Sequence, residues 1–214
     1  MTTTAVRPVL TETFWTTDES TQLWIKRAVL LVVGIAVLTL AAHVRVAVPP
    51  SPVAVNLGTF AVLTIGVAYG PRLGLATILA YMVIGALGFD VFQSSTAELN
   101  GLSYMMGSTG GYLAGYVLAI AAMGVLARRG WDRSVLLMAG AMLIGNVLLY
   151  VPGLAWLSIW IETAGKLDVA TYGSLWEQTL TWGITPFLIG DAMKLALAAL
   201  LLPAIWKLVG DARV

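Results

Sequence analysis

Long apolar stretches are the feature that most constrains how this chain can fold. A membrane-spanning helix needs about 20 mostly apolar residues, because the hydrocarbon core of a bilayer is about 30 Å thick. With 59% hydrophobic and 11% charged residues, the composition also lies far from that of a soluble domain. The chain is therefore expected to be an integral membrane protein. Four stretches reach or approach this length almost without interruption: Trp24 to Val46, Gly111 to Leu126, Ser134 to Trp156 and Ile184 to Leu208.

A fifth apolar block, Leu57 to Phe89, is too long for one span. It is interrupted by Gly70, Pro71 and Arg72, a combination typical of a turn, and is expected to form two short helices. The prediction is an all-α integral membrane protein with six transmembrane helices, in which residues 23–210 form the membrane domain. Residues 1–22 are polar and are expected to form a loose cytoplasmic tail with an amphipathic foot near Phe14 and Trp15.

The basic residues provide an independent prediction of orientation, because cytoplasmic loops carry an excess of Lys and Arg. If the N-terminus is cytoplasmic, most basic residues fall on that side, and only Arg45, Lys166 and Lys194 do not. Both termini are therefore expected in the cytoplasm. The connections on the opposite side, residues 45–56, 90–108 and 158–183, are the long ones, so a functional site is expected on the external face.

Two charged residues lie inside the last apolar stretch, in the sequence TPFLIGDAMKLALAALLLPAIW. Asp191 and Lys194 are three residues apart, so a helix places them on one face. A charged side chain at the centre of a membrane helix costs roughly 2.5 to 3.5 kcal/mol even on insertion scales. The pair is either a mutual ion pair that lowers this cost or part of a ligand site, and both interpretations remain open from the residues alone.

A glycine-rich segment, GSTGGYLAG at residues 107–115, precedes and enters another apolar stretch. Gly111 and Gly115 are spaced for close helix packing, whereas Gly107 to Gly110 could offer backbone N–H groups to a polar ligand. The sequence has no nucleotide-binding GxxxxGK[ST] pattern, no cysteine and no metal-ligand spacing. Its net charge of +1 does not suggest a nucleic-acid partner.

Three segments together resemble the BioY family, the biotin-binding S components of energy-coupling-factor vitamin transporters. They are NLGTFAVLTIGVAYGPRLGLATILAYMVIGALGFDVF at 56–92, GSTGGYLAGY at 107–116 and PFLIGDAMK at 186–194. The resemblance implies a six-helix, multi-pass protein of the prokaryotic plasma membrane that captures biotin from outside and catalyses no reaction. It also implies partners, a transmembrane coupling subunit and cytoplasmic ATPases, and no cofactor or metal, with biotin as the transported ligand.

The resemblance also assigns substrate-binding residues. Asp191 and Lys194 occupy the family's Gly-Asp-x-x-Lys pattern; Asp191 is expected to accept from the ureido N–H groups, and Lys194 to steady Asp191 or to contact a biotin oxygen. Tyr112 matches the Tyr of the Gly-Gly-Tyr pattern, with Thr109 and Gly110 beside it.

Two asparagines complete the predicted site. Asn100 precedes the Gly-Gly-Tyr motif and is a candidate partner for the ureido group or the carboxylate. Asn56 stands where the family usually has Thr, and Gly58 where it has Gln, so Asn56 is expected to replace the missing amide.

Two other functions remain as alternatives. The first is a membrane-bound enzyme acting on lipid or peptide with Asp191 as acid or base, which would require a second catalytic group within reach. The second is an S component for another vitamin, such as thiamine or riboflavin.

Overall fold

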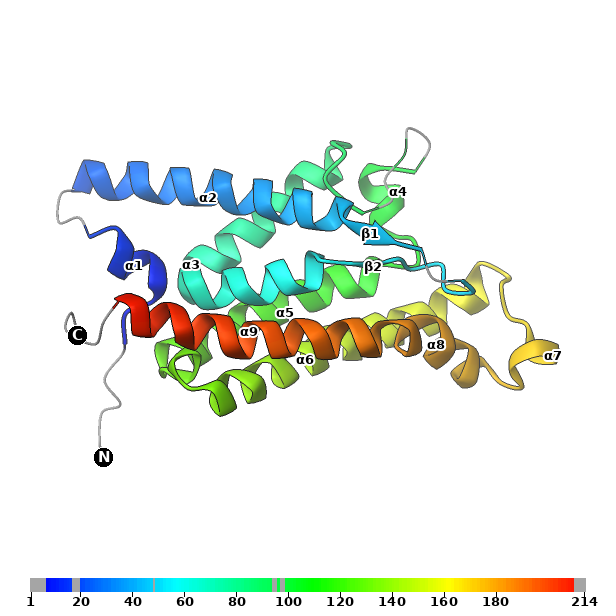
Figure 1. The fold of residues 1–214 in the computed structure, drawn as a ribbon. Helices are drawn as coiled ribbons and strands as arrows, with labels where there is room; N and C mark the ends of the chain where they lie inside the picture. The colour runs from blue at the N-terminus through cyan, green and yellow to red at the C-terminus, as the bar shows by residue number, and fades with distance from the viewer. Residues whose placement is uncertain (1–6, 17–19, 48, 94–95, 97–98, 210–214) are drawn as a thin grey trace, which may run out of the picture.

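The computed structural model of this protein describes residues 7–16, 20–47, 49–93, 96 and 99–209. Five of its helical segments are long and apolar enough to cross a membrane, and they lie roughly side by side (Figure 1). The prediction of an all-α fold made of membrane-length helices is confirmed. In chain order the elements are α1 (Leu10–Phe14), α2 (Ser20–His43), β1 (Arg45–Val46), β2 (Val55–Asn56), α3 (Gly58–Ala86), α4 (Gly101–Met105), α5 (Gly110–Arg128), η1 (Trp131–Arg133), α6 (Val135–Thr163), α7 (Val169–Tyr172), α8 (Leu175–Gly183), η2 (Thr185–Phe187) and α9 (Leu188–Val209).

Helix α3 is sharply bent at the predicted turn. Gly70 has φ 74° and ψ 176°, a backbone conformation that is open essentially to glycine, and Pro71 follows it. In Figure 1 the first half of α3 runs toward the left end of the molecule and the second half returns toward the right. The two expected short helices are thus the two halves of one bent element. The length criterion counts five spanning segments, so it does not by itself establish the predicted number of six.

Glycines allow α5 and α6 to approach closely. A methyl group added at Gly111 would lie 2.3 Å from the carbonyl oxygen of Pro152, and one at Gly115 would lie 2.6 Å from that of Leu149. Both distances are far below van der Waals contact, so a larger residue at either position would separate the helices. The prediction that Gly111 and Gly115 serve helix packing is confirmed.

The segment of residues 7–16 packs against the bundle instead of hanging free. Val9 and Leu10 are 0% and 5% exposed, and the backbone N–H of Arg7 donates to the carbonyl of Arg128 at 3.0 Å. The guanidinium of Arg128 also donates two hydrogen bonds of 2.5 Å to the carboxylate of Glu12. The expectation of a loose tail is wrong for this segment, because two apolar side chains and an ion pair fix it to the end of α5.

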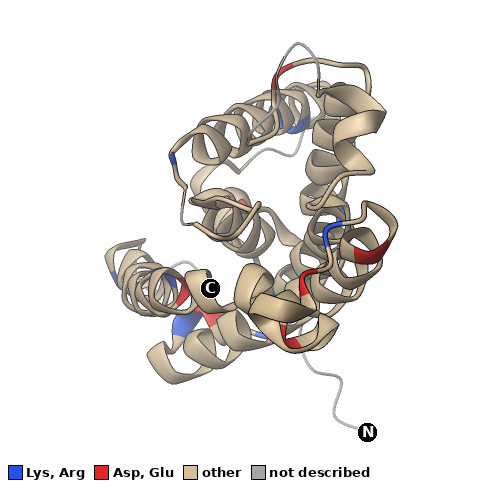
Figure 2. Cartoon of the chain, turned by 90° about the vertical axis from the view of Figure 1, so that its right-hand side faces the viewer, with Lys and Arg blue, Asp and Glu red and all other residues tan. Residues whose placement is uncertain are grey.

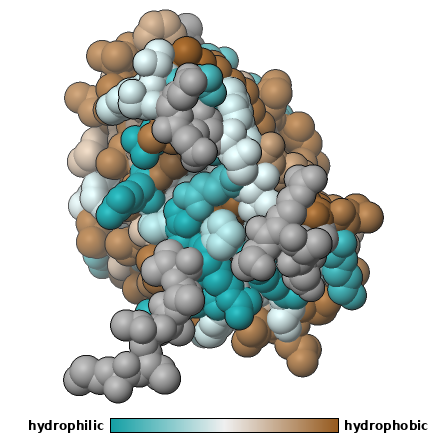
Figure 3. All heavy atoms as spheres, turned by 90° about the vertical axis from the view of Figure 1, so that its left-hand side faces the viewer, coloured by the Kyte–Doolittle hydropathy of each residue, from teal (hydrophilic) through white to brown (hydrophobic). Residues whose placement is uncertain are grey.

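The outer surfaces of the long helices carry large apolar side chains, as contact with lipid requires. Exposed examples are Val32 and Leu40 on α2, Val147 and Val151 on α6, and Leu200 on α9. Hydrophilic residues gather instead at the left-hand end of Figure 1, where Figure 3 shows them as a band bordered by apolar residues. Viewed from the opposite end, Figure 2 shows Lys, Arg, Asp and Glu sparsely placed on the helices and loops.

Candidate functional site

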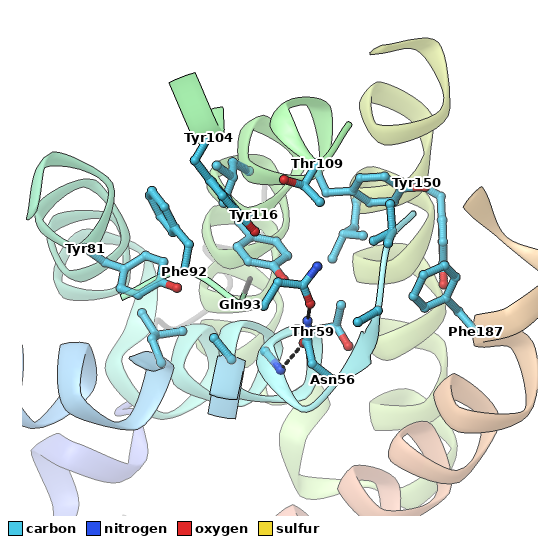
Figure 4. A pocket seen from close by; sticks show the side chains of 18 of the residues that line it. Asn56, Thr59, Tyr81, Phe92, Gln93, Tyr104, Thr109, Tyr116, Tyr150 and Phe187 are labelled. Atoms are coloured by element: carbon cyan, nitrogen blue, oxygen red, sulfur yellow. Dashed lines mark hydrogen bonds between the residues drawn. The ribbon is translucent and has the colours of Figure 1, made fainter. Parts of the chain in front are cut away.

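The bundle encloses a cavity near the end opposite to α1, which we call the central cavity. The cavity and the open solvent at its mouth together make up about 640 Å³ of space. Side chains from α2, β2, both halves of α3, α5, α6 and α9 converge on it (Figure 4). Its lining residues are Leu38, Ala42, Val53, Ala54, Asn56, Gly58, Thr59, Tyr81, Phe92, Gln93, Tyr104, Thr109, Tyr112, Leu113, Tyr116, Leu149, Tyr150, Phe187 and Lys194.

A buried ion pair forms one wall of the central cavity. Lys194 and Asp191 are only 9% and 7% exposed, and the ammonium Nζ lies 3.0 Å from the carboxylate Oδ1. The same ammonium donates to Thr59 Oγ1 at 2.9 Å, and the hydroxyl of Tyr150 donates to Asp191 Oδ2. Both carboxylate oxygens therefore have a donor, which offsets the cost of burying the charge.

The ion pair is asymmetric with respect to the cavity. Lys194 and Tyr150 line it, whereas Asp191 is not among the lining residues and lies behind them. An ammonium has three donors, and two of those of Lys194 are used by Thr59 and Asp191. One N–H therefore remains for an oxygen atom of a ligand.

A polar cluster at the mouth depends on the short β1–β2 hairpin. Arg45 and Asn56 are directly paired across this antiparallel ribbon, so their side chains are neighbours. Arg45 Nη1 donates to the backbone carbonyl of Gln93 at 2.8 Å, while the Asn56 amide donates to Gln93 Oε1. Asn56 Oδ1 in turn accepts from the backbone N–H of Gly58 at 2.6 Å. The hairpin thereby holds Gln93 over the cavity, beside Asn56 (Figure 4).

Aromatic rings make up much of the remaining wall. Phe92 stacks on Tyr104 with ring centroids 4.9 Å apart, and it meets Tyr81 edge-on at 5.4 Å. The hydroxyl of Tyr81 donates to the carbonyl of Val91 at 2.7 Å, which fixes the chain just before Phe92. Such a wall suits an apolar ring system, since aromatic faces offer a large contact area and favour contact with sulfur.

The geometry therefore suits a compact molecule with an apolar ring body and polar ends. Comparison with known proteins establishes the family of this chain. The model of the BioY family matches residues 12–211, which is nearly the whole chain. This chain belongs to the BioY family.

Curated relatives in the BioY family span a similar length. A protein of Pyrococcus horikoshii named "Probable biotin transporter BioY" is 28% identical, and the alignment covers 82% of this chain and 93% of the relative. A Methanothermobacter thermautotrophicus protein of the same name is 37% identical over 65% of this chain and 85% of its own length. Among solved structures, the crystal structure of the S-component for biotin from an ECF-type ABC transporter has a similar fold. It superimposes with a TM-score of 0.67 and 17% identity, covering 89% of this chain and 95% of that one.

The site residues expected from the BioY resemblance separate into two groups in the structure. Asn56, Thr109, Tyr112 and Lys194 line the central cavity, with Asp191 directly behind. The Tyr112 hydroxyl donates to the carbonyl of Gly183 at 2.7 Å, so this residue offers its ring rather than its hydroxyl.

Gly110 and Asn100 are not among the cavity-lining residues. The N–H of Gly110 donates to the carbonyl of Gly107 at 3.1 Å, and a methyl group there would meet the carbonyl of Met105 at 2.1 Å. Asn100 is the residue before α4, and its carbonyl accepts from Ser103 Oγ at 2.6 Å. Contact of either residue with a ligand stays a prediction.

Several lining residues were not predicted. Tyr116 could have been found from its spacing, because it lies one helical turn after Tyr112 and shares its face. Tyr150 was visible as a hydroxyl group in an otherwise apolar stretch, but its pairing with Asp191 depends on the packing of α6 against α9. The other polar and aromatic lining residues that were missed are Thr59, Tyr81, Phe92, Tyr104 and Phe187.

Proposed function

We propose that this chain captures biotin in the central cavity and serves as the substrate-specific subunit of an energy-coupling-factor transporter. The observation that carries the proposal is the Lys194 ammonium, buried in the wall of a cavity whose other lining residues are uncharged, and held by Asp191 and Thr59. The names of the BioY relatives, and of the S-component whose fold is similar, supply the identity of the ligand.

Biotin has the chemistry that the cavity can hold. Its ureido group has two N–H donors and a carbonyl acceptor, its thiophane ring is apolar, and its valerate chain ends in a carboxylate. Lys194 donates to a biotin oxygen, while the paired amides of Asn56 and Gln93 hydrogen-bond to polar atoms nearer the mouth. The rings of Phe92 and its aromatic neighbours pack against the thiophane ring and its sulfur.

Asp191 contributes mainly by positioning the two side chains that donate hydrogen bonds to it. Because its oxygens accept from Lys194 and Tyr150, it fixes both groups at the cavity wall. Each carboxylate oxygen has two lone pairs, so a ureido N–H group that reached between Lys194 and Tyr150 would still find an acceptor on Asp191. This arrangement explains why two charges occur in an apolar helix.

The chain works in the plasma membrane of a prokaryote with both termini in the cytoplasm and six spans. The two opposed halves of α3 supply the second and third spans, and the central cavity then faces outward. The protein is a transport subunit and not an enzyme. A transmembrane coupling subunit and cytoplasmic ATPases supply the energy, since the sequence has no nucleotide-binding motif of its own.

A competition assay tests the choice of ligand. Purified chain in detergent is equilibrated with radiolabelled biotin and then with an excess of unlabelled biotin, thiamine or riboflavin. Only unlabelled biotin is expected to displace the label. Displacement by thiamine or riboflavin, or no retained label at all, would contradict the assignment.

A further inference from the structure

A second large hollow lies at the opposite end of the bundle from the central cavity. It is bounded by α1, the first half of α2, the bend of α3 and the end of α5, and it contains about 2380 Å³ of space including its wide opening. We call it the basic groove, because Lys26, Arg27, Arg72, Arg128 and Arg129 all line it, against one acid, Glu12. It lies where Figure 3 shows the hydrophilic band of this end.

Polar and apolar residues are arranged in the basic groove by depth. On α2, Leu30 and Leu31 line it four residues further along the helix than Lys26 and Arg27. Four residues of helix correspond to about 6 Å, so Leu30 and Leu31 lie deeper in the membrane than the two cations. Trp24, which also lines the groove, lies on the other side of the cations, where a tryptophan suits headgroup depth.

The other two walls repeat this gradient. On α3, Arg72 lies at the bend, and Leu73 and Ala76 follow it along the half that leads away from this end. On α5, Val125 comes before Arg128, which stands at the end of the helix. Each of the three helices thus presents a cation at the membrane boundary and an apolar surface below it.

The cations of the basic groove differ in whether they have a hydrogen-bond or ion-pair partner. Arg128 is bound to Glu12, and the Lys26 ammonium donates to the carbonyl of Trp15. Arg72 and Arg129 are exposed, and within the described part of the chain neither makes a hydrogen bond or an ion pair. Arg27 lies 5.7 Å from the centroid of the Trp24 ring and, among the described residues, also has no carboxylate partner. The groove therefore holds three guanidinium groups, of which Arg72 and Arg129 make no other polar contact within the described residues.

We propose that the basic groove binds one anionic phospholipid of the leaflet at this end, with its phosphate between Arg72 and Arg129. Guanidinium groups bind phosphate oxygens in a bidentate manner, and basic hollows between membrane helices are suited to anionic headgroups. The acyl chains lie along Leu30, Leu31 and Leu73. A soluble phosphate would leave these apolar walls uncovered. A phospholipid places its phosphate on the cations and its acyl chains on the apolar walls.

Native mass spectrometry of the detergent-purified full chain provides the test. The protein is incubated with an equimolar mixture of dioleoyl-phosphatidylglycerol and dioleoyl-phosphatidylcholine, and the retained lipid is measured. One phosphatidylglycerol is expected to be retained in preference to phosphatidylcholine. A basic residue near an anionic headgroup corresponds to about a fivefold change in affinity, so Arg72→Gln and Arg129→Gln should each reduce retention about fivefold.

A matched control removes the same charge outside the groove. Lys207 is exposed near the end of α9 and does not line the basic groove, so Lys207→Gln should leave phosphatidylglycerol retention unchanged. Unchanged biotin binding by Arg72→Gln and Arg129→Gln, whose residues are remote from the central cavity, verifies that these variants are folded. Sodium phosphate added in excess should not displace the lipid.

Three results would overturn the proposal. Equal retention of the two lipids would show no headgroup selection, and an equal loss in Lys207→Gln would show only a general effect of charge. If the groove variants kept phosphatidylglycerol but lost association with the coupling subunit, the groove would be a protein-docking surface instead.

Discussion

The hydrogen bond from Tyr150 to Asp191 allows a quantitative test of how the charged wall of the central cavity is organised. Tyr150→Phe removes the hydroxyl and keeps the ring, while Asp191 retains its bond to Lys194. We expect biotin affinity to fall by about 1 kcal/mol, or about fivefold. Asp191→Asn removes the charge that holds both donors, so we expect a loss of about 2 to 3 kcal/mol, or about 30- to 150-fold.

The double variant separates two explanations. If Tyr150 acts through Asp191, the double variant binds biotin as weakly as Asp191→Asn alone, to within about 0.5 kcal/mol. Titration calorimetry of the four proteins in one detergent measures this. The control is Tyr69→Phe, which removes a hydroxyl that donates to the carbonyl of Leu30 at 2.8 Å, away from the central cavity, and should leave affinity unchanged.

Additive losses, with the double variant about fivefold weaker than Asp191→Asn, would refute the positioning role of Asp191 for Tyr150. Folding must be checked by size-exclusion chromatography, because leaving Lys194 buried without its partner is expected to cost about 3 to 5 kcal/mol of stability.

Three further predictions concern other parts of the chain. Thr59→Val removes one of the two acceptors of the Lys194 ammonium and should weaken biotin binding by about 1 kcal/mol, measured by the same titration; an unchanged affinity would contradict the role given to this bond. Gly111→Ala places a methyl group 2.3 Å from the backbone of α6 and should lower stability by about 1 to 3 kcal/mol in a detergent-unfolding assay, whereas Gly140→Ala, with its nearest neighbour at 3.7 Å, should not. Burial raises the pKa of the Glu12 carboxyl, but the hydrogen bond and charge of Arg128 outweigh it and leave the pKa below its usual value of 4.5. A carboxyl whose pKa is lowered by folding stabilises the folded form while it is ionised, and this stabilisation is lost as it becomes protonated. Hydrogen-exchange protection of residues 7–16 should therefore persist at pH 7 and decline below about pH 4. In Arg128→Gln the decline should begin at higher pH, and identical profiles would contradict this account.

The sequence was sufficient to predict the features that depend on local pattern. Apolar runs located the long helices, and the Gly70–Pro71 pair located the bend in α3. Asp191 and Lys194 could be recognised because a charged pair in an apolar helix is costly whatever surrounds it. The packing roles of Gly111 and Gly115 followed from their spacing alone.

Features that depend on tertiary packing could not be predicted. The aromatic wall comes from Tyr81 on α3, Phe92 in the loop after it and Tyr104 on α4, and no sequence spacing relates these three rings. Docking of the N-terminal segment was missed for the same reason. Val9 and Leu10 form too short an apolar run to predict burial, and Arg128 lies 116 residues from its partner Glu12.

Direct titration of biotin into the purified wild-type chain tests the central claim most directly. The account predicts saturable binding of one biotin per chain without partner subunits, because the residues proposed to hold the ligand all belong to this chain. A folded protein that released no heat and retained no biotin at any concentration would contradict the assignment of the central cavity as a biotin site.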